Sequence, residues 1–363
     1  MKYTLQFKTG DAELRALKNI PQEIFSKADF RLLIEITRGR KSKCDTLGLV
    51  AKRIDSLNSF LSPNIKVFFD VTSDPNLGNE EIDTLYSIND GYNNWRNFFD
   101  KLYHQYVNAT PMLVINDEDA DYTNFSRQIS LFSEKYHRIG YKIYPNIDAD
   151  TIRRELRILK DTISADTHVF IFYDQGYIVD GLIKFAENKA VEYLGIASAI
   201  FETHANIEYI FTSTSFPDSV TSLSGTMDGN INCAEITLFN CVADAVQNIA
   251  LSYSDYGSIT PKRNDDVAFY SNGWTPRIDV PISDNLIFYY RQKRENRDYA
   301  DVYVDVANRC ITDRRFPKDL TCWGCDTIKG AASGLKPGST PSFWISVRMN
   351  IYIYQRLRGL SII

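Results

Sequence analysis

The chain of 363 residues could form roughly two or three average domains, or one α/β barrel, which routinely takes about 250 residues. Its net charge of −5 argues against a protein that coats nucleic acid, although a local basic groove is compatible with it. We expect a cytoplasmic protein, because no apolar run of about 18 residues could cross a membrane and the N-terminus lacks the apolar core of a signal peptide. The six cysteines then fit reduced thiols.

Short apolar runs of strand length alternate with longer segments of helical period along the first two thirds of the chain. In chain order, the expected strand and helix pairs are Thr4–Phe7 with Asp11–Ile20, Phe30–Thr37 with Thr46–Leu61, Lys66–Thr72 with Asn89–Tyr106, Pro111–Asp117 with Tyr122–Ile139, Tyr141–Ile147 with Asp150–Ile163, His168–Asp174 with Leu182–Ala199, Ile207–Ser213 with Cys233–Val246, and finally the strand Ile249–Ser254. The strand runs are almost continuously apolar, which is typical of parallel strands covered on both faces.

Eight such units in one chain favour a closed barrel over an open sheet, because closure removes the two exposed edges. No glycine-rich fingerprint follows the first strand, which argues against a dinucleotide-binding fold. We therefore predict a TIM-like (β/α)8 barrel over residues 1–260.

The pattern changes after the eighth strand. Asp255–Arg277 is rich in turn residues, Asn285–Gln292 is an expected strand, and Tyr299–Ile311 and Phe343–Leu357 are expected helices. No Ser/Gly-rich linker separates this part from the barrel. Residues 261–363 are therefore expected to be a C-terminal extension that packs on the barrel as part of the same structural unit.

Several expected strands carry one polar residue at or near the C-terminal end. The carboxylates are Glu35, Asp70, Asp117 and Asp174, the hydroxyls Ser213 and Ser215 follow the seventh strand, and Asp255 and Tyr256 follow the eighth. Because an unpaired charge is costly against an apolar helix layer, we expect these side chains to face the barrel axis and its mouth, where active sites of this fold lie. Asp117 belongs to an acidic run at 117–119, so Glu35, Asp70 and Asp174 form the core of the predicted site.

Such a cluster is compatible with three kinds of chemistry. Asp70 and Asp174 could bind Mg²⁺ or Mn²⁺ and polarise a phosphoryl group. Two carboxylates could act as acid and base on a glycosidic bond, or the group could hold a ligand without reaction. The structural alternative is that Glu35 and Asp70 pair with Arg or Lys side chains and only fill the barrel interior.

Two other stretches have features of anion binding. Thr212–Pro217 follows the seventh strand, where loops of this fold often bind phosphate, but it lacks the usual glycines. Tyr290 and Arg291, with neighbouring Tyr, Lys and Arg residues, form a basic and aromatic patch that could stack bases and hold phosphates. The alternative for the patch is a strand end with solvated charges. His168 opens the sixth strand at the bottom of the barrel, which argues against a catalytic role for it.

The thiols at Cys322 and Cys325 form a CxxC pair. A zinc site would need a second such pair or nearby histidines, and neither is present in sequence. We therefore expect a turn with two small thiols. Cys44, Cys233 and Cys241 are expected to be buried or surface thiols.

The chain resembles the phage and bacterial "beta protein" family. The resemblance rests on Lys8-x-Gly10-Asp11-x-Glu13-x-x-Ala16-Leu17, LLIEI at 32–36, FFDV at 68–71, Ser215-Phe216-Pro217, Ser254-Asp255-Tyr256-Gly257, Ile287-x-x-Tyr290 and Trp344 before a terminal helix. It implies a barrel-like fold in a protein of phages or of bacterial mobile and defence regions, without implying a reaction. The matching site positions are Glu35, Asp70, Ser215, Asp255, Tyr256 and Tyr290. Relatives carry paired histidines in the terminal helix, whereas this chain has none at 348–352.

The leading hypothesis is a carboxylate-dependent or metal-dependent hydrolase of phage–host conflict, encoded by a phage or used in anti-phage defence. Its substrate would be a phosphodiester, a nucleotide or a nucleic-acid-type ligand. Glu35, Asp70 and Asp174 would be catalytic, and the expected ligand-binding residues are Ser213, Ser215, Asp255, Tyr256, Tyr290 and Arg291. The alternatives are a non-catalytic module that binds a phage or host protein, and a glycosidase-like enzyme.

Overall fold

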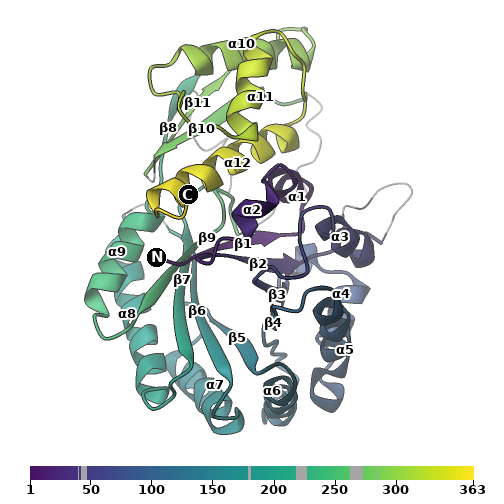
Figure 1. The fold of residues 1–363 in the computed structure, drawn as a ribbon, viewed down its shortest axis with the longest axis vertical. Helices are drawn as coiled ribbons and strands as arrows, with labels where there is room; N and C mark the ends of the chain where they lie inside the picture. Colours follow the sequence, from purple (N-terminus) through teal and green to yellow (C-terminus); the bar gives the residue numbers. More distant parts are fainter. Residues whose placement is uncertain (40, 42–46, 179–180, 218–226, 262–272, 284) are drawn as a thin grey trace.

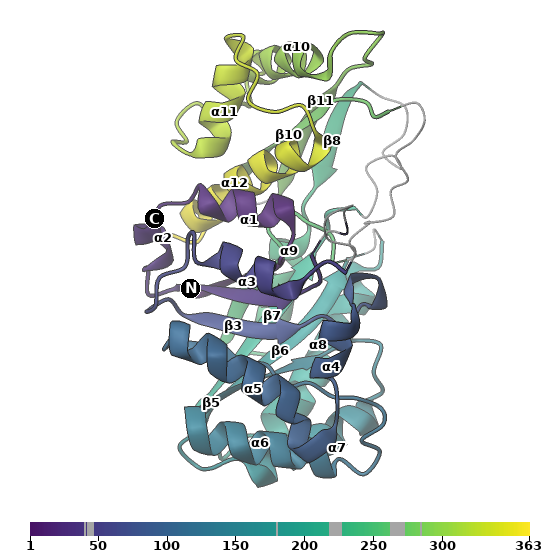
Figure 2. The same ribbon diagram turned by 90° about the vertical axis from the view of Figure 1, so that its right-hand side faces the viewer.

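The structure is a computed structural model that describes residues 1–363 apart from 40, 42–46, 179–180, 218–226, 262–272 and 284. Cys44 therefore lies outside the described residues, and so does Thr46, the first residue of the expected second helix. Figures 1 and 2 show a barrel with a smaller unit, built mainly from the C-terminal part of the chain, on one side of it. No described helix is both long and apolar enough to cross a membrane.

The barrel contains eight parallel strands in the order β4-β3-β2-β1-β9-β7-β6-β5. Their bounds are β1 Tyr3–Lys8, β2 Phe30–Ile36, β3 Val67–Val71, β4 Ala109–Pro111, β5 Arg138–Ile143, β6 His168–Tyr177, β7 Ile207–Thr214 and β9 Leu251–Asp255. A single parallel bridge between Met112 and Gly140 joins the two edge strands, so the barrel is nearly closed. The predicted TIM-like α/β barrel is confirmed.

Helices surround the barrel, as the alternating sequence pattern predicted. They are α1 Asp11–Lys18, α2 Gln22–Phe25, α3 Val50–Leu57, the 3-10 helix Pro75–Leu77, α4 Glu80–Leu85, α5 Asn89–Gln105, α6 Thr123–Tyr136, α7 Ala149–Thr162, α8 Ile183–Ile200 and α9 Glu235–Ala245. Helix α7 illustrates why they form: Asp148 caps its first backbone N–H groups, and Ile152, Leu156 and Leu159 recur on one buried face.

The seam between β4 and β5 differs from the sequence prediction. Strand β4 ends at Pro111, where the expected strand began, and β5 begins three residues before the expected Tyr141. Helix α6 stops early because His137 adopts a left-handed conformation with φ 53°. Gly140 allows the two strands to approach, since a Cβ atom there would lie 2.2 Å from Met112 Sδ. The close approach at this seam therefore depends on a glycine.

The barrel interior is layered along its axis. The middle layer is an apolar cluster of Leu33, Phe68, Met112, Phe172 and Ile210. Side chains two residues further along the same strands form a polar layer at the C-terminal mouth, and side chains two residues earlier form another at the N-terminal end. The apolar layer therefore separates two polar regions at opposite ends of the barrel.

The smaller unit is a three-stranded antiparallel sheet with three helices. The sheet order is β10 (Arg277–Ser283), β11 (Leu286–Arg291) and β8 (Asp228–Asn232), and the helices are α10 Tyr299–Thr312, α11 Trp323–Ala332 and α12 Pro341–Gly359. The sequence did not predict β8 or β10. Strand β8 (DGNIN) has Ile231 as its one large apolar residue, so its sequence shows no apolar and polar alternation. Helix α12 packs against both β10 and α1, which anchors the unit to the barrel (Figure 2).

The CxxC pair lies at a helix start and not in the expected turn. Cys322 is the N-cap of α11, and its Sγ accepts the backbone N–H of Cys325 at 3.4 Å. The first N–H groups of a helix lack partners within the helix, so a side chain that accepts one of them favours a helix start. Both thiols are buried.

Candidate functional site at the barrel mouth

Three neighbouring strands place charged side chains in one row at the mouth. Lys8 on β1 is in register with Glu35 on β2, and Glu35 is in register with Asp70 on β3. Each residue is the last or the last but one of its strand and lies on the face that points to the barrel axis, four residues beyond the polar layer at the opposite end. The Lys8 ammonium donates to Glu35 in a buried ion pair.

Lys142 on β5 connects this row to the far side of the barrel. Its Nζ lies 2.6 Å from Asp70 Oδ2 and 4.0 Å from Asp174 Oδ2 on β6. Glu35, Asp70 and Asp174 are 8%, 6% and 2% exposed, so all three carboxylates are buried together. The predicted convergence of these three acids at the mouth is therefore observed, and a lysine lies among them.

Asp174 is held by neutral donors as well. Gln6 Nε2 donates to its Oδ2 at 3.2 Å, and the Tyr256 hydroxyl lies 2.6 and 2.7 Å from its two oxygens. We call Gln6, Lys8, Glu35, Asp70, Lys142, Asp174 and Tyr256 the mouth cluster. Thr212 and Ser254 lie in register beside Asp174, and their buried hydroxyls have no hydrogen-bond partner among the described residues. Each of these two fully buried hydroxyls therefore has a donor that no described residue accepts.

The environment separates the pKa values of the two adjacent carboxyls. Burial raises the pKa of Asp70. The positive charge of Lys142 acts to lower this pKa and the negative charge of Glu35 acts to raise it, and the net effect is an increase. Burial also acts to raise the pKa of Glu35, but the charges of Lys8 and Lys142 outweigh it and lower that pKa. Burial and Asp174 raise the pKa of Tyr256, which keeps its hydroxyl protonated. Asp70 thus holds a proton more readily than Glu35.

The mouth cluster does not fit a resident divalent ion. The Lys142 ammonium lies between Asp70 and Asp174, where a shared Mg²⁺ or Mn²⁺ would have to be. Within the described ranges, no group of three or more His, Cys, Asp or Glu side chains could hold a metal ion. The arrangement instead pairs carboxylates with ammonium groups and hydroxyls.

Asp255 and Ser215 do not lie in the mouth, contrary to the expectation that they would face it. Asp255 accepts from the hydroxyls of Tyr3 and Tyr253, both at 2.7 Å, on the outer face of the barrel wall. The Ser215 hydroxyl donates to Glu235 at 2.5 Å. The reason is that side chains alternate between the two faces along a strand. Asp255 points the same way as Tyr253, toward the helices, whereas Tyr256 points the opposite way. Ser213 is the register partner of Asp255.

These outer residues join a buried polar cluster beneath the terminal helix. Arg356 Nε lies 3.1 Å from Asp255 Oδ2, and the Tyr352 hydroxyl donates to Glu235 at 2.5 Å and to Asp255 at 3.0 Å. We call Ser215, Glu235, Asp255, Tyr352 and Arg356 the interface cluster. It connects β9 and α9 of the barrel to α12, the helix in which relatives are expected to carry histidines.

The remaining predicted residues are separate from both clusters. Tyr290 and Arg291 lie on β11 of the smaller unit; the Tyr290 hydroxyl donates to Asp313 at 3.0 Å, and the Arg309 guanidinium lies over its ring at 4.4 Å. Asp117 is exposed in the turn after β4. The basic and aromatic patch is therefore not part of the barrel mouth.

Sequence reasoning missed the two lysines of the mouth cluster as site residues. Lys142 lies between Tyr141 and Ile143 in an otherwise apolar strand, which is the same signal that identified Glu35 and Asp70. Lys8 was recognised only as part of the first motif of the family resemblance, and not as a site residue. A lone cation between apolar strand neighbours should be weighed in the same way as a lone acid, because both are costly to bury without a partner.

The fold and the site define an α/β barrel protein with a buried cluster of carboxylates and lysines at its mouth. The model of the Beta protein family matches residues 3–358, so the chain belongs to that family. Among solved structures, an endo-glycoceramidase II from Rhodococcus sp. in a cellobiose-like isofagomine complex is similar, with 11% identity, a TM-score of 0.30, and coverage of 70% of this chain and 74% of that chain. No curated protein matches the chain.

Proposed function

We propose that the mouth cluster is the active site of a carboxylate-dependent hydrolase that works by acid–base catalysis. The observation that supports this most is the pair Glu35 and Asp70, which are register neighbours whose pKa values are displaced in opposite directions. Two carboxyls with separated pKa values are a recurrent basis for acid and base roles in one site. The metal-dependent form of the hypothesis is less compatible with the lysine between the carboxylates.

In the proposed reaction Asp70 is the general acid, because its pKa is raised while that of Glu35 is lowered, so of the two it holds a proton more readily. Glu35 stays ionised and acts as the nucleophile or as the base that activates water. Neighbouring parallel strands are about 5 Å apart, which is of the order that carboxyl pairs need in retaining glycoside hydrolysis. Asp174 and Tyr256 orient the substrate, with the Thr212 and Ser254 hydroxyls beside them.

The substrate class we propose is a nucleotide or nucleic-acid-type ligand, cleaved at its glycosidic bond. Lys8 and Lys142 are already paired with carboxylates, so the mouth cluster has less capacity for the extra negative charge of a phosphodiester reaction centre. Phosphodiester hydrolysis remains the competing reaction to be tested. The sequence resemblance supports a setting in phage–host conflict, where a phage encodes the protein or a host uses it against phage.

The test compares purified wild type with Asp70→Asn and Glu35→Gln on nucleosides, nucleotides, aryl glycosides and an aryl phosphodiester. We expect each substitution to lower kcat by about 10²- to 10⁴-fold, the usual contribution of a general acid or base. The rate of the wild type should fall at high pH as Asp70 loses its proton and at low pH as Glu35 gains one. Asp117→Asn is the matched control, because this acid is exposed after β4.

Thermal unfolding of each variant separates lost chemistry from lost fold. The proposal fails if folded Asp70→Asn and Glu35→Gln keep wild-type turnover, or if no substrate class is cleaved. If the wild type cleaves only the aryl phosphodiester, its reaction is phosphodiester hydrolysis and not cleavage of a glycosidic bond. A phage challenge of cells that express wild type or Asp70→Asn tests the biological setting separately.

A non-catalytic role is favoured by one observation. The three carboxylates are nearly inaccessible, and each contacts a lysine, as in a barrel interior whose charges are paired for packing. The protein would then act as a module that binds a phage or host protein. Pull-down of a stoichiometric partner by both wild type and Asp70→Asn, without turnover of any substrate, would support this alternative.

A further inference from the structure

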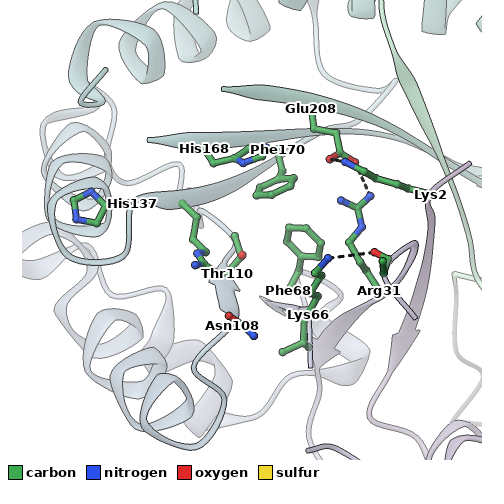
Figure 3. A pocket seen from close by; sticks show the side chains of 13 residues that line it. Lys2, Arg31, Lys66, Phe68, Asn108, Thr110, His137, His168, Phe170 and Glu208 are labelled. Carbon is green, nitrogen blue, oxygen red and sulfur yellow. Dashed lines mark hydrogen bonds and ion pairs between the residues drawn. The ribbon is translucent and has the colours of Figure 1, made fainter. Parts of the chain in front are cut away.

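A cavity of about 390 Å³ lies at the N-terminal end of the barrel, opposite the mouth (Figure 3). Its volume falls in the range of small-molecule pockets, about 300 to 1,000 Å³. Phe68 of the apolar middle layer forms part of its lining, so that layer separates the cavity from the mouth cluster. A ligand here would be independent of the proposed active site.

The cavity has an excess of positive charge. Lys2, Arg31, Lys66 and Arg138 line it together with one acid, Glu208. Lys2 and Arg31 share that acid at 2.7 and 2.6 Å, as Figure 3 shows. The charges therefore do not balance locally, although the whole chain has a net charge of −5. Such a local excess in an acidic protein favours an anionic ligand.

Three of the basic groups that line the cavity retain hydrogen-bonding capacity. Lys66 Nζ donates to the carbonyl of Ala28 at 3.2 Å and keeps further N–H donors. The guanidinium of Arg138, which is half-buried at the start of β5, makes no hydrogen bond or ion pair with any residue that the structure describes. Arg31 is 5% exposed, and its Nε likewise has no partner within that part of the chain. Guanidinium groups with free donors are well suited to bind phosphate oxygens.

Strand β6, next to the strand that carries Arg138, offers a flat aromatic surface. The His168 ring stacks on Phe170 with centroids 4.3 Å apart and an interplanar angle of 5°. Phe170 in turn meets Phe68 edge-on at 4.9 Å. Figure 3 shows the three rings facing the cavity from two sides of the barrel. Burial lowers the pKa of His168, so its ring is neutral at neutral pH and can stack on a heterocycle.

We propose that this cavity binds a nucleoside monophosphate, with the phosphate at Arg138 and the base against the His168 ring. The positive charge accounts for the phosphate, the stacked rings account for a planar base, and the volume accommodates both. Neither feature alone would select this class, because a simple anion needs no aromatic wall and a neutral heterocycle needs no excess of cations.

The test is isothermal titration calorimetry of the full chain with the four common ribonucleoside 5′-monophosphates, inorganic phosphate and the matching nucleosides. We expect saturable binding of at least one monophosphate, tighter than that of its nucleoside and of inorganic phosphate. Arg138→Gln should weaken binding at least about tenfold, because it removes charge-assisted hydrogen bonds. His168→Ala should weaken it about tenfold through lost stacking.

Arg157→Gln is the matched control, since it makes the same chemical change at an exposed position on α7 and should leave binding unchanged. The binding that Arg138→Gln weakens should persist in Asp70→Asn, which distinguishes this site from the mouth cluster. The proposal is overturned if no monophosphate binds saturably, or if Arg138→Gln binds as tightly as wild type. Equal affinity for inorganic phosphate and the best monophosphate overturns it as well.

Discussion

The ammonium of Lys142 lies 2.6 Å from the Asp70 carboxylate, inside a barrel whose other interior side chains at mid-height are apolar. Burial alone would lower the pKa of this lysine, but Asp70 and its neighbours outweigh that effect and raise the pKa well above its usual value. The lysine is therefore charged at all physiological pH values. Its charge stabilises carboxylates that burial would otherwise make costly.

Lys142→Met should destabilise the protein by about 3 to 5 kcal/mol at neutral pH, because it leaves Asp70 and Asp174 buried without this cation. The loss should shrink as the pH falls and the carboxylates take up protons. Urea unfolding at pH 7 and pH 5 measures both effects. Lys184→Met, at an exposed pair with Glu187, is the control and should cost less than about 1 kcal/mol. Equal effects of the two substitutions would contradict the proposed role of Lys142.

Gly140→Ala should disturb the seam between β4 and β5, because its new Cβ atom would lie 2.2 Å from the buried Met112 Sδ. We expect a loss of about 1 to 3 kcal/mol from overpacking. Gly195→Ala is the matched control: it lies in α8 with open space around it and should stabilise the helix by about 1 kcal/mol. Denaturant unfolding compares them. If Gly140→Ala is as stable as wild type, the seam does not need a glycine.

Glu208 should contribute to the acid sensitivity of the fold. Burial acts to raise its pKa, but Arg31 and its other partners lower the pKa from 4.5 to about 2. A lowered pKa means that its stabilising effect is complete above about pH 4.5 and is lost as the pH falls toward about 2. The shift corresponds to about 3 kcal/mol. Glu208→Gln should therefore be less stable than wild type at pH 7, with a difference that closes at low pH.

Unfolding free energies between pH 7 and pH 2 provide the measurement for Glu208→Gln, and Glu202→Gln at an exposed position is the control. A constant difference between Glu208→Gln and wild type over this range would show that the carboxylate does not titrate as described.

The contrast between Asp70 and Asp255 shows how far sequence could predict the site. Asp70 lies between the apolar residues Phe69 and Val71. The alternation of faces along the strand was therefore clear, and it predicted that Asp70 points inward. Asp255 ends the strand LSYSD, in which polar residues occupy both faces, and the cation that pairs with its outward carboxylate, Arg356, comes from a helix about 100 residues later. Long-range partners of this kind leave no local pattern in the sequence.

The same distinction explains which elements were predicted. The eight parallel strands were recognised as short apolar runs that alternate with helical segments, whereas β8 and β10 belong to a small antiparallel sheet. The N-cap position of Cys322 was also missed, because cysteine is not one of the usual N-cap residues, which carry a side-chain oxygen. Local preference was sufficient for the barrel strands and for β11, α10 and α12 of the smaller unit, and insufficient for β8, β10 and α11.

Arg356→Met should weaken the attachment of the terminal helix to the barrel. The side chain is 1% exposed and contacts Asp255 at 3.1 Å and Glu235 at 3.4 Å, so its removal leaves two carboxylates in the interior without their cation. We expect a loss of about 3 to 5 kcal/mol in the free energy of unfolding. Arg358→Met is the matched control on the same helix, because that arginine is 45% exposed and pairs with the exposed Asp319. Adding Asp255→Asn to Arg356→Met should restore part of the loss, since one buried charge is then removed. A double variant no more stable than the single one would argue that Arg356 acts through packing and not through its charge.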